Sequence, residues 1–146
     1  MSDDFVLSSV TFVPPEALVD LYDSVGWSAY TRDPAVLTKA VGGSDCVFIV
    51  REDGQLIGLA RAISDDASVV YVQDILVRPS HQGKGLGRAL VNAILKRYSH
   101  VRQKVLLTDD RPEQLRFYES LGFRNTRSLT RTPLNAFVII EGAELG

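Results

Sequence analysis

The sequence predicts a single α+β domain over residues 1–146, with a mixed, mostly antiparallel sheet of about six to seven strands and about four helices. Three strand-like segments follow one another between residues 45 and 77 and are joined by short turns. A glycine-rich loop at 82–87 then leads into a helix with a broad apolar face. A short strand-like segment after that helix completes a strand–loop–helix–strand unit over 68–108 at the centre of the chain.

The first forty residues are expected to form one strand, over 5–10, and two helices, over 15–25 and 33–40. Each helix starts at a proline, which is favoured at the first helical position, and each ends at glycine. In the second helix, the aspartate before the proline is a good N-cap. The loop between the helices carries two large aromatic residues, Trp27 and Tyr30.

The middle of the chain has the pattern of an antiparallel series of strands. Residues 45–52 and 55–63 are rich in apolar and β-branched residues, and Asp53-Gly54 between them is a strong hairpin signal. A second polar turn leads into a third strand over 68–77. Short turns of this kind connect antiparallel neighbours, so the three strands should be adjacent in the sheet.

The last third of the chain combines helical and strand-like patterns. Asp110 and Glu113 have the spacing of a capping box, and Gly122 suits the end of a helix. The β-branched and aromatic run AFVII is typical of a strand. The remaining predicted elements are a helix over 85–98, a strand over 103–108, a helix over 110–121, a strand from Phe123 onward and a strand over 136–140.

Composition and charge narrow the function classes. The formal net charge is −2 and the hydrophobic fraction is 45%, which favours an ordinary globular protein over one that binds nucleic acid. One cysteine, Cys46, excludes an internal disulfide, and its apolar neighbours predict a buried thiol in a reducing compartment. With no signal peptide and no long apolar run, we expect a cytoplasmic protein without a membrane partner. A homodimer is compatible with the sequence.

The glycine-rich loop is a candidate phosphate site. Free N–H groups at a helix N-terminus, together with the helix dipole, attract anions, and Lys84 and Arg88 add full positive charges. The spacing fits neither the P-loop nor the dinucleotide fingerprint, because the positions where those motifs require their final residues carry other side chains. The alternative is a tight strand-to-helix turn without a ligand.

The pattern that does match is Gln82-x-x-Gly85-x-Gly87, preceded by Leu76-Val77-Arg78-Pro79 and followed by FYESLGF at 117–123. With these motifs, the chain resembles the GCN5-related N-acetyltransferase (GNAT) family, and the order of its elements matches over nearly the whole length. The resemblance implies a sheet with splayed central strands and acetyl-coenzyme A (acetyl-CoA) as co-substrate.

The resemblance also implies which residues hold the coenzyme. The strand before the loop would carry a bulge and part from its neighbour, so that the pantetheine arm pairs with its main chain. Arg111 stands where the family often has an asparagine that contacts this arm, so that contact is either charged or absent. The implied coenzyme-binding residues are Ile75, Leu76, Val77, Gln82, Gly83, Lys84, Gly85, Leu86, Gly87, Arg88 and Arg111.

Two residues are candidates for the catalytic proton transfers. The family transfers acetyl directly to an amine, so the acceptor must lose a proton and the thiolate must gain one. Tyr118 occupies the position that often protonates the thiolate; alternatively, it is a core residue of its helix. Asp74 interrupts an apolar strand and is the candidate base or cation-binding group; alternatively, it pairs with Arg61. Alternation along a strand predicts that Gln73 and Asp74 point to opposite faces.

The acceptor side is less determined by the sequence. Trp27, Tyr30 and Gln73 are the candidate substrate-binding residues, for a small primary amine or a peptide terminus. Trp27 and Tyr30 are equally compatible with packing the first helix on the sheet. No metal site is expected. Two rival functions stay open: an acyl-CoA-binding module without turnover, and an unrelated protein that binds a phosphate ligand.

Overall fold

The computed structural model describes residues 4–146 of the chain. These divide into two compact units, Met1–Leu107 and Thr108–Gly146, each of which is described by itself. The larger unit carries the whole sheet, the glycine-rich loop and the predicted acceptor residues. The smaller unit carries Arg111 and Tyr118.

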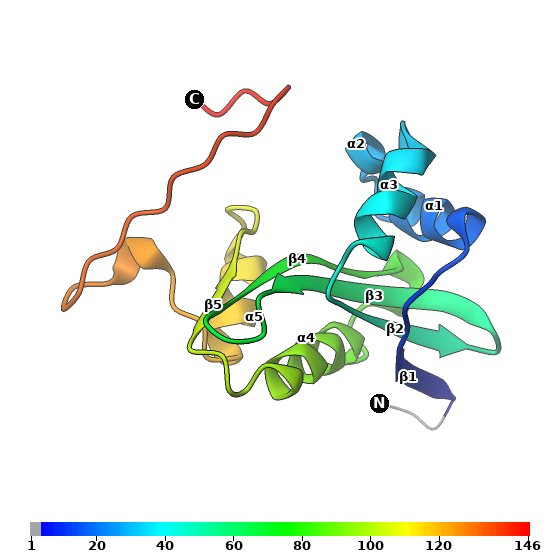
Figure 1. The fold of residues 1–146 in the computed structure, drawn as a ribbon, viewed down its shortest axis with the longest axis horizontal. Coiled ribbons are helices and arrows are strands. Elements are labelled where there is room, and N and C mark those ends of the chain that lie inside the picture. The colour runs from blue at the N-terminus through cyan, green and yellow to red at the C-terminus, as the bar shows by residue number, and fades with distance from the viewer. Residues whose placement is uncertain (1–3) are drawn as a thin grey trace. The chain divides into compact units, whose positions relative to one another are not determined.

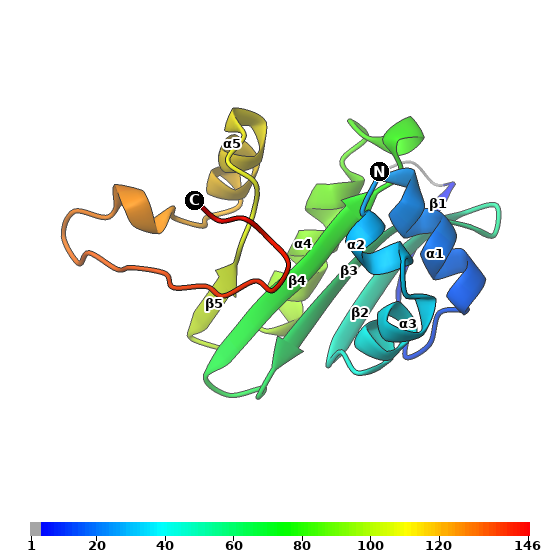
Figure 2. The ribbon, with the colours of Figure 1, turned by 90° about the horizontal axis from the view of Figure 1, so that it is seen from above.

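The larger unit is built on a five-stranded mixed sheet in the order β1-β2-β3-β4-β5. Neighbouring strands are antiparallel except for β4 and β5, which are parallel. Figure 2 shows the strands side by side from above. The mixed sheet is as predicted, but it has five strands where six to seven were expected. The strands are β1 (Phe5–Ser9), β2 (Cys46–Glu52), β3 (Gln55–Ser64), β4 (Val69–Val77) and β5 (Gln103–Leu106).

Helices cover both faces of this sheet. In Figure 1, α1 (Pro15–Ser24), α2 (Ser28–Thr31) and α3 (Pro34–Gly42) lie on one face, and α4 (Leu86–Arg97) lies on the other. The predicted cap of α3 is confirmed, since the Asp33 carboxylate accepts a hydrogen bond from the Val36 N–H at 3.3 Å. The short helix α2 forms within the predicted aromatic loop. None of the helices described here has the length and apolar character needed to cross a bilayer.

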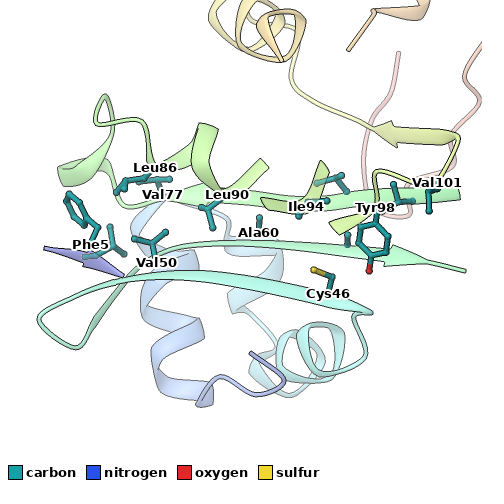
Figure 3. Packing of buried hydrophobic residues seen from close by; sticks show 14 residues of the cluster. Phe5, Cys46, Val50, Ala60, Val77, Leu86, Leu90, Ile94, Tyr98 and Val101 are labelled. Carbon is teal, nitrogen blue, oxygen red and sulfur yellow. The ribbon is translucent and has the colours of Figure 1, made fainter. Parts of the chain in front are cut away.

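The layer between α4 and the sheet is one apolar cluster. Leu86, Leu90 and Ile94 recur at helical spacing and point from α4 onto strand residues that include Ala60 and Val50 (Figure 3). Cys46 is buried in the same layer, as its apolar surroundings predicted. Burying these side chains fixes α4, and therefore the loop that precedes it, against the sheet.

A second apolar cluster holds the three N-terminal helices on the opposite face. It combines Leu18, Leu21 and Leu37 of α1 and α3 with strand residues that include Leu59 and Leu76. The ring of Tyr22 is buried in the same cluster, and Trp27 and Tyr30 are partly buried against it. Polar groups at the edge of this layer form the network described below.

The smaller unit contains α5 (Pro112–Ser120) and a single turn of 3-10 helix, η2 (Thr126–Ser128), followed by an irregular segment. The predicted capping by Asp110 is wrong: the N-cap of α5 is Arg111, without a side-chain hydrogen bond, and Asp110 instead pairs with Arg127 at 3.1 Å. The end of the helix is as predicted, because Gly122 adopts φ +99°.

The two predicted C-terminal strands, from Phe123 onward and over 136–140, are absent from residues 108–146. After Gly122, the Asn125 side chain accepts a hydrogen bond from the Arg127 N–H and forms η2 instead. The segment over 136–140 has strand-forming side chains, and Phe137 is 92% exposed. A strand requires hydrogen bonds to a neighbouring strand, and composition alone does not supply that neighbour.

Candidate active site

The site begins with an irregularity in β4. Arg61 of β3 lies opposite Asp74, but the next residue, Ala62, lies opposite Val72, so Gln73 is an extra residue in β4. This is a β-bulge, as the family resemblance implied. On its other side, β4 pairs with β5 only from Val69 to Val72. The pairing of these two strands therefore ends where the bulge begins.

Among the described residues, no strand therefore pairs with one edge of the second half of β4. From Ile75 to Val77 the strand pairs with β3 on one side and with no strand of residues 4–146 on the other. An open edge presents N–H and C=O groups that an extended, amide-containing ligand satisfies in place of a strand. This is the geometry expected for a pantetheine arm.

The glycine-rich loop directly follows this open edge. Gly83 and Gly85 have φ of +80° and +82°, in the left-handed region that favours glycine. Gly85 is also the N-cap of α4 and carries no side-chain cap, so the first N–H groups of the helix have no partner within it. The Gln82 side chain donates a hydrogen bond to the Val77 carbonyl at 3.1 Å, which fastens the loop to the end of β4.

Charged and polar side chains around the loop are held by the strands beneath it. Arg78 donates to the Leu56 carbonyl at 2.7 Å and to the Asp20 carboxylate at 2.6 Å. His81 lies 3.0 Å from Glu52, which fixes its ring at the base of the loop. Lys84 lies over the Phe5 ring, 5.9 Å from the ring centroid. These contacts order the loop before any ligand arrives.

Asp74 lies at the centre of a buried polar network. It is 3% exposed, and its Oδ2 atom accepts hydrogen bonds from Arg61 Nε at 2.6 Å and from the Tyr22 hydroxyl at 2.8 Å. Its Oδ1 atom accepts from the Tyr30 hydroxyl at 2.7 Å. The ion pair with Arg61, predicted as the alternative role of Asp74, is present, and both carboxylate oxygens are occupied.

Gln73 joins the same network from the bulge. Its Nε2 atom donates to the Tyr30 hydroxyl at 3.1 Å, while Tyr30 donates to Asp74. The prediction that Gln73 and Asp74 point to opposite faces is therefore wrong, because both side chains form hydrogen bonds with Tyr30. Regular alternation does not hold across a bulge. Of the predicted acceptor residues, the structure brings Gln73, Asp74 and Tyr30 together.

Three aromatic rings surround this network. Tyr22 lies 5.1 Å from Tyr30 and 5.8 Å from Trp27 between ring centroids, with edge-on geometry in both pairs. Trp27 and Tyr30 are partly buried against the apolar cluster of α1 and α3. Tyr22 is not among the predicted site residues, because its helical spacing indicates only a core position.

Burial and charge shift the ionisation of the network residues. Burial, and next the nearby Asp74 carboxylate, raise the pKa of Tyr22 and of Tyr30 above the usual phenol range. Burial opposes the charged form of Arg61, but the adjacent Asp74 more than offsets this, so the pKa of Arg61 is raised. The network therefore contains one guanidinium, one carboxylate and two neutral phenols.

All five tyrosines are expected to titrate above their ordinary range in the folded protein. Burial raises the pKa of Tyr22, Tyr30, Tyr71, Tyr98 and Tyr118, the last to about 12. Because the unfolded phenols ionise near pH 10, the stability that these shifts contribute is fully present below that pH. It is lost as the pH rises toward 12. In a pH titration, phenolate absorbance of the folded protein should therefore rise at higher pH than that of the unfolded protein. Ionisation of all five rings near pH 10 in the folded protein would contradict this prediction.

In the smaller unit, Tyr118 and Arg111 lie on or beside α5. Tyr118 contacts the rings of Phe117 and Phe123 edge-on, at centroid distances of 5.0 Å and 6.0 Å. Arg111 is exposed and lies 3.6 Å from Asp109 and 3.5 Å from Glu113. The motif FYESLGF thus folds into an aromatic group that surrounds one phenol, and the charge of Arg111 is shared with two carboxylates.

Comparisons with known proteins agree with this geometry. Residues 43–125 match the model of the acetyltransferase (GNAT) domain. An uncharacterized N-acetyltransferase of Gracilaria tenuistipitata var. liui is 35% identical over 126 residues, which cover 80% of this chain and 65% of that protein. A histone acetyltransferase of Glycine max is 31% identical over 134 residues, which cover 83% of this chain and 56% of that protein. The chain thus spans less than two thirds of these two relatives.

Solved structures show the same fold. A GNAT-family acetyltransferase of Streptococcus pneumoniae TIGR4 superimposes with a TM-score of 0.78 at 26% identity, covering 95% of this chain and 99% of that one. The matched family region includes β4, the glycine-rich loop and the aromatic motif. The chain belongs to the GNAT acetyltransferase family.

Proposed function

We propose that the protein is an acetyl-CoA-dependent N-acetyltransferase that moves the acetyl group directly from the thioester to a primary amine. The observation that carries this proposal is the open edge of β4 from Ile75 to Val77, which runs directly into an N-terminal loop of α4 with left-handed glycines. One extended ligand with amides at one end and a pyrophosphate at the other matches both features.

The donor is held by main-chain groups in this proposal. The pyrophosphate lies against the loop from Gln82 to Arg88, where α4 begins and Lys84 adds positive charge. The pantetheine amides pair with Ile75, Leu76 and Val77. A backbone N–H of this edge also donates a hydrogen bond to the thioester carbonyl oxygen and stabilises the oxyanion of the tetrahedral intermediate. Arg111, which is exposed, would make a charged contact to the coenzyme in place of the family's asparagine contact.

The two proton transfers, to the leaving thiolate and from the acceptor amine, take place on different sides of the site. The Tyr118 phenol protonates the departing thiolate, and its pKa of about 12 keeps the proton available at neutral pH. On the acceptor side, Asp74 is either the base or part of the group that binds the amine, together with Tyr30, Gln73 and Trp27. No covalent enzyme intermediate is needed, and the buried Cys46 takes no part.

The acceptor is a small primary amine or a peptide N-terminus, and the protein acts in the cytoplasm. The aromatic pair Trp27 and Tyr30 supplies an apolar wall beside the polar network. Within residues 4–146, His, Cys, Asp and Glu side chains form no group of three suited to a metal ion. The proposed reaction is acid–base chemistry carried by side chains and main-chain groups.

Thermal denaturation with different ligands tests the donor half. Acetyl-CoA and free CoA should each raise the Tm, and NAD should not, because only a CoA arm uses the β4 edge. In Gly85→Ala, the side chain meets no neighbour but strains a left-handed residue by about 1–2 kcal/mol, so the stabilisation by acetyl-CoA should shrink. Gly42→Ala, with open space and ordinary φ, is the control. No stabilisation by either CoA form would refute the proposed function.

A further inference from the structure

The hydrogen bonds around Asp74 have a fixed direction. A guanidinium only donates and a carboxylate only accepts, so Arg61 and Asp74 determine the polarity of everything bonded to them. The single proton of the Tyr30 hydroxyl is given to Asp74 Oδ1 at 2.7 Å. The Tyr30 oxygen can therefore act toward its other neighbours only as an acceptor.

This direction carries over to Gln73. Because Tyr30 has no proton left to give, the Gln73 amide must face it through its NH2 group, and Nε2 lies 3.1 Å from the Tyr30 oxygen. The Gln73 carbonyl oxygen then points away from the network. Successive hydrogen bonds that run in one direction also strengthen one another. A buried carboxylate thus decides which atom of an exposed amide is available at the surface.

Gln73 is also the outermost member of this network. It is exposed, whereas Asp74 and Arg61 are 3% and 5% exposed. As the extra residue of the bulge, it stands where β4 leaves β5 and the open edge begins. A carbonyl oxygen at this point lies next to the proposed thioester position and suits an ammonium, which has three protons to donate and nothing to accept.

We infer that Gln73 binds the acceptor ammonium through its carbonyl oxygen, and that Asp74 is a positioning residue that orients this amide through Tyr30 and is not the proton acceptor. The ammonium loses its proton to solvent at this exposed position. The inference rests on the proposed function and assigns roles within its acceptor site. The charges of Arg61 and Asp74 offset each other, so the amine is recognised by an oriented dipole and by its N–H groups. An amine without N–H groups should therefore bind poorly.

Asp74→Asn tests the positioning role. Arg61 and Tyr22 require the asparagine oxygen, so its NH2 faces Tyr30, whose proton must turn to Gln73. Gln73 then presents NH2 to the ammonium. We expect the KM for the amine to rise on the order of tenfold, as for loss of a hydrogen bond to a charged group, with kcat within about twofold. A fall in kcat at unchanged KM would make Asp74 the base and overturn the inference.

A second substitution should reverse this loss. In the double variant Gln73→Glu with Asp74→Asn, the glutamate accepts the Tyr30 proton with one oxygen and offers the other to the amine, so the amine KM should return toward the wild-type value. No recovery would overturn the inference. Tyr30→Phe is the second single variant, since it keeps the Arg61–Asp74 pair and should raise the amine KM as Asp74→Asn does. An unchanged amine KM in Tyr30→Phe would also overturn the inference.

The matched control is Tyr98→Phe, which removes the hydroxyl of a buried tyrosine in the apolar layer under α4, outside the polar network. Its amine KM should stay within about twofold of wild type.

The substrate panel consists of tyramine, hexylamine, glucosamine and a free tripeptide, and acetylation is measured by thiol release from acetyl-CoA. Trimethylated tyramine, whose ammonium lacks N–H groups, serves as a competitor. Equal binding of tyramine and this competitor, or no saturable amine in the panel, would overturn the inference. Acetyl-CoA binding by thermal shift is measured separately and should be unchanged in every variant.

Discussion

Replacing Tyr118 by phenylalanine is expected to lower kcat for thiol release by about 100- to 10,000-fold, the usual contribution of a general acid. The thiolate would leave without a proton donor, whereas the ring contacts with Phe117 and Phe123 would be kept. The affinity for acetyl-CoA should change little, because the hydroxyl acts on the leaving sulfur. Free thiol measured over the amine panel, with acetyl-CoA binding measured in parallel, separates the two effects.

The control for this experiment is Tyr98→Phe, which removes another buried phenol beside the apolar layer under α4. Its rate should match that of the wild type. An unchanged rate in Tyr118→Phe would assign Tyr118 to packing within its aromatic group. Wild-type protein that binds acetyl-CoA but releases no thiol with any amine would instead favour an acyl-CoA-binding module without turnover.

Replacing Arg61 by methionine should lower the free energy of unfolding by about 3–5 kcal/mol, the typical cost of breaking a buried ion pair. Asp74 would remain buried, with hydrogen bonds from two tyrosines but without a compensating cation. Urea denaturation should show a lower midpoint with little change in the slope, because the surface exposed on unfolding stays similar.

Two further variants make this result specific. The pair His100–Asp66 is exposed on both sides, so His100→Gln should change stability little. Replacing both buried partners, as in Arg61→Met with Asp74→Leu, should recover most of the stability, because the uncompensated charge is removed. If the double variant were as unstable as Arg61→Met alone, lost packing rather than the charge would be the cause.

Local patterns in the sequence were sufficient for most elements of the larger unit. The prolines before α1 and α3, the Asp53-Gly54 turn and the periodic leucines of α4 each act within a few residues, so their effect is visible in the sequence. The glycine-rich loop was predictable for the same reason. Its left-handed residues and its place at the start of α4 are local properties.

The acceptor network was only partly predictable, because it joins residues far apart in the sequence. Tyr30 and Asp74 are 44 positions apart, and Tyr22 and Asp74 are 52 apart. Nothing local indicates that they meet. The bulge at Gln73 also defeats the count of alternating positions along β4, on which the expected directions of Gln73 and Asp74 depended.

The predicted C-terminal strands failed for a different physical reason. Residues 136–140 have the right side chains for a strand, but the formation of a strand depends on hydrogen bonds to a neighbouring one. Asp110 illustrates a similar limit at helix α5. Its spacing from Glu113 fits a capping box, yet the carboxylate is engaged by Arg127, a competitor that the spacing rule does not consider.

The bulge in β4 also separates the length of this strand from its register. Asp74 lies opposite Arg61 because Gln73 is accommodated as an extra residue. If the same residues paired regularly from Val72 onward, Gln73 would lie opposite Arg61, and Asp74 would lie opposite Ala60, in the apolar layer under α4. Deleting Gln73 would remove the bulge and still leave Asp74 opposite Arg61. An engineered version that lost Gln73 should therefore keep the buried ion pair and its stability while losing the proposed contact to the amine.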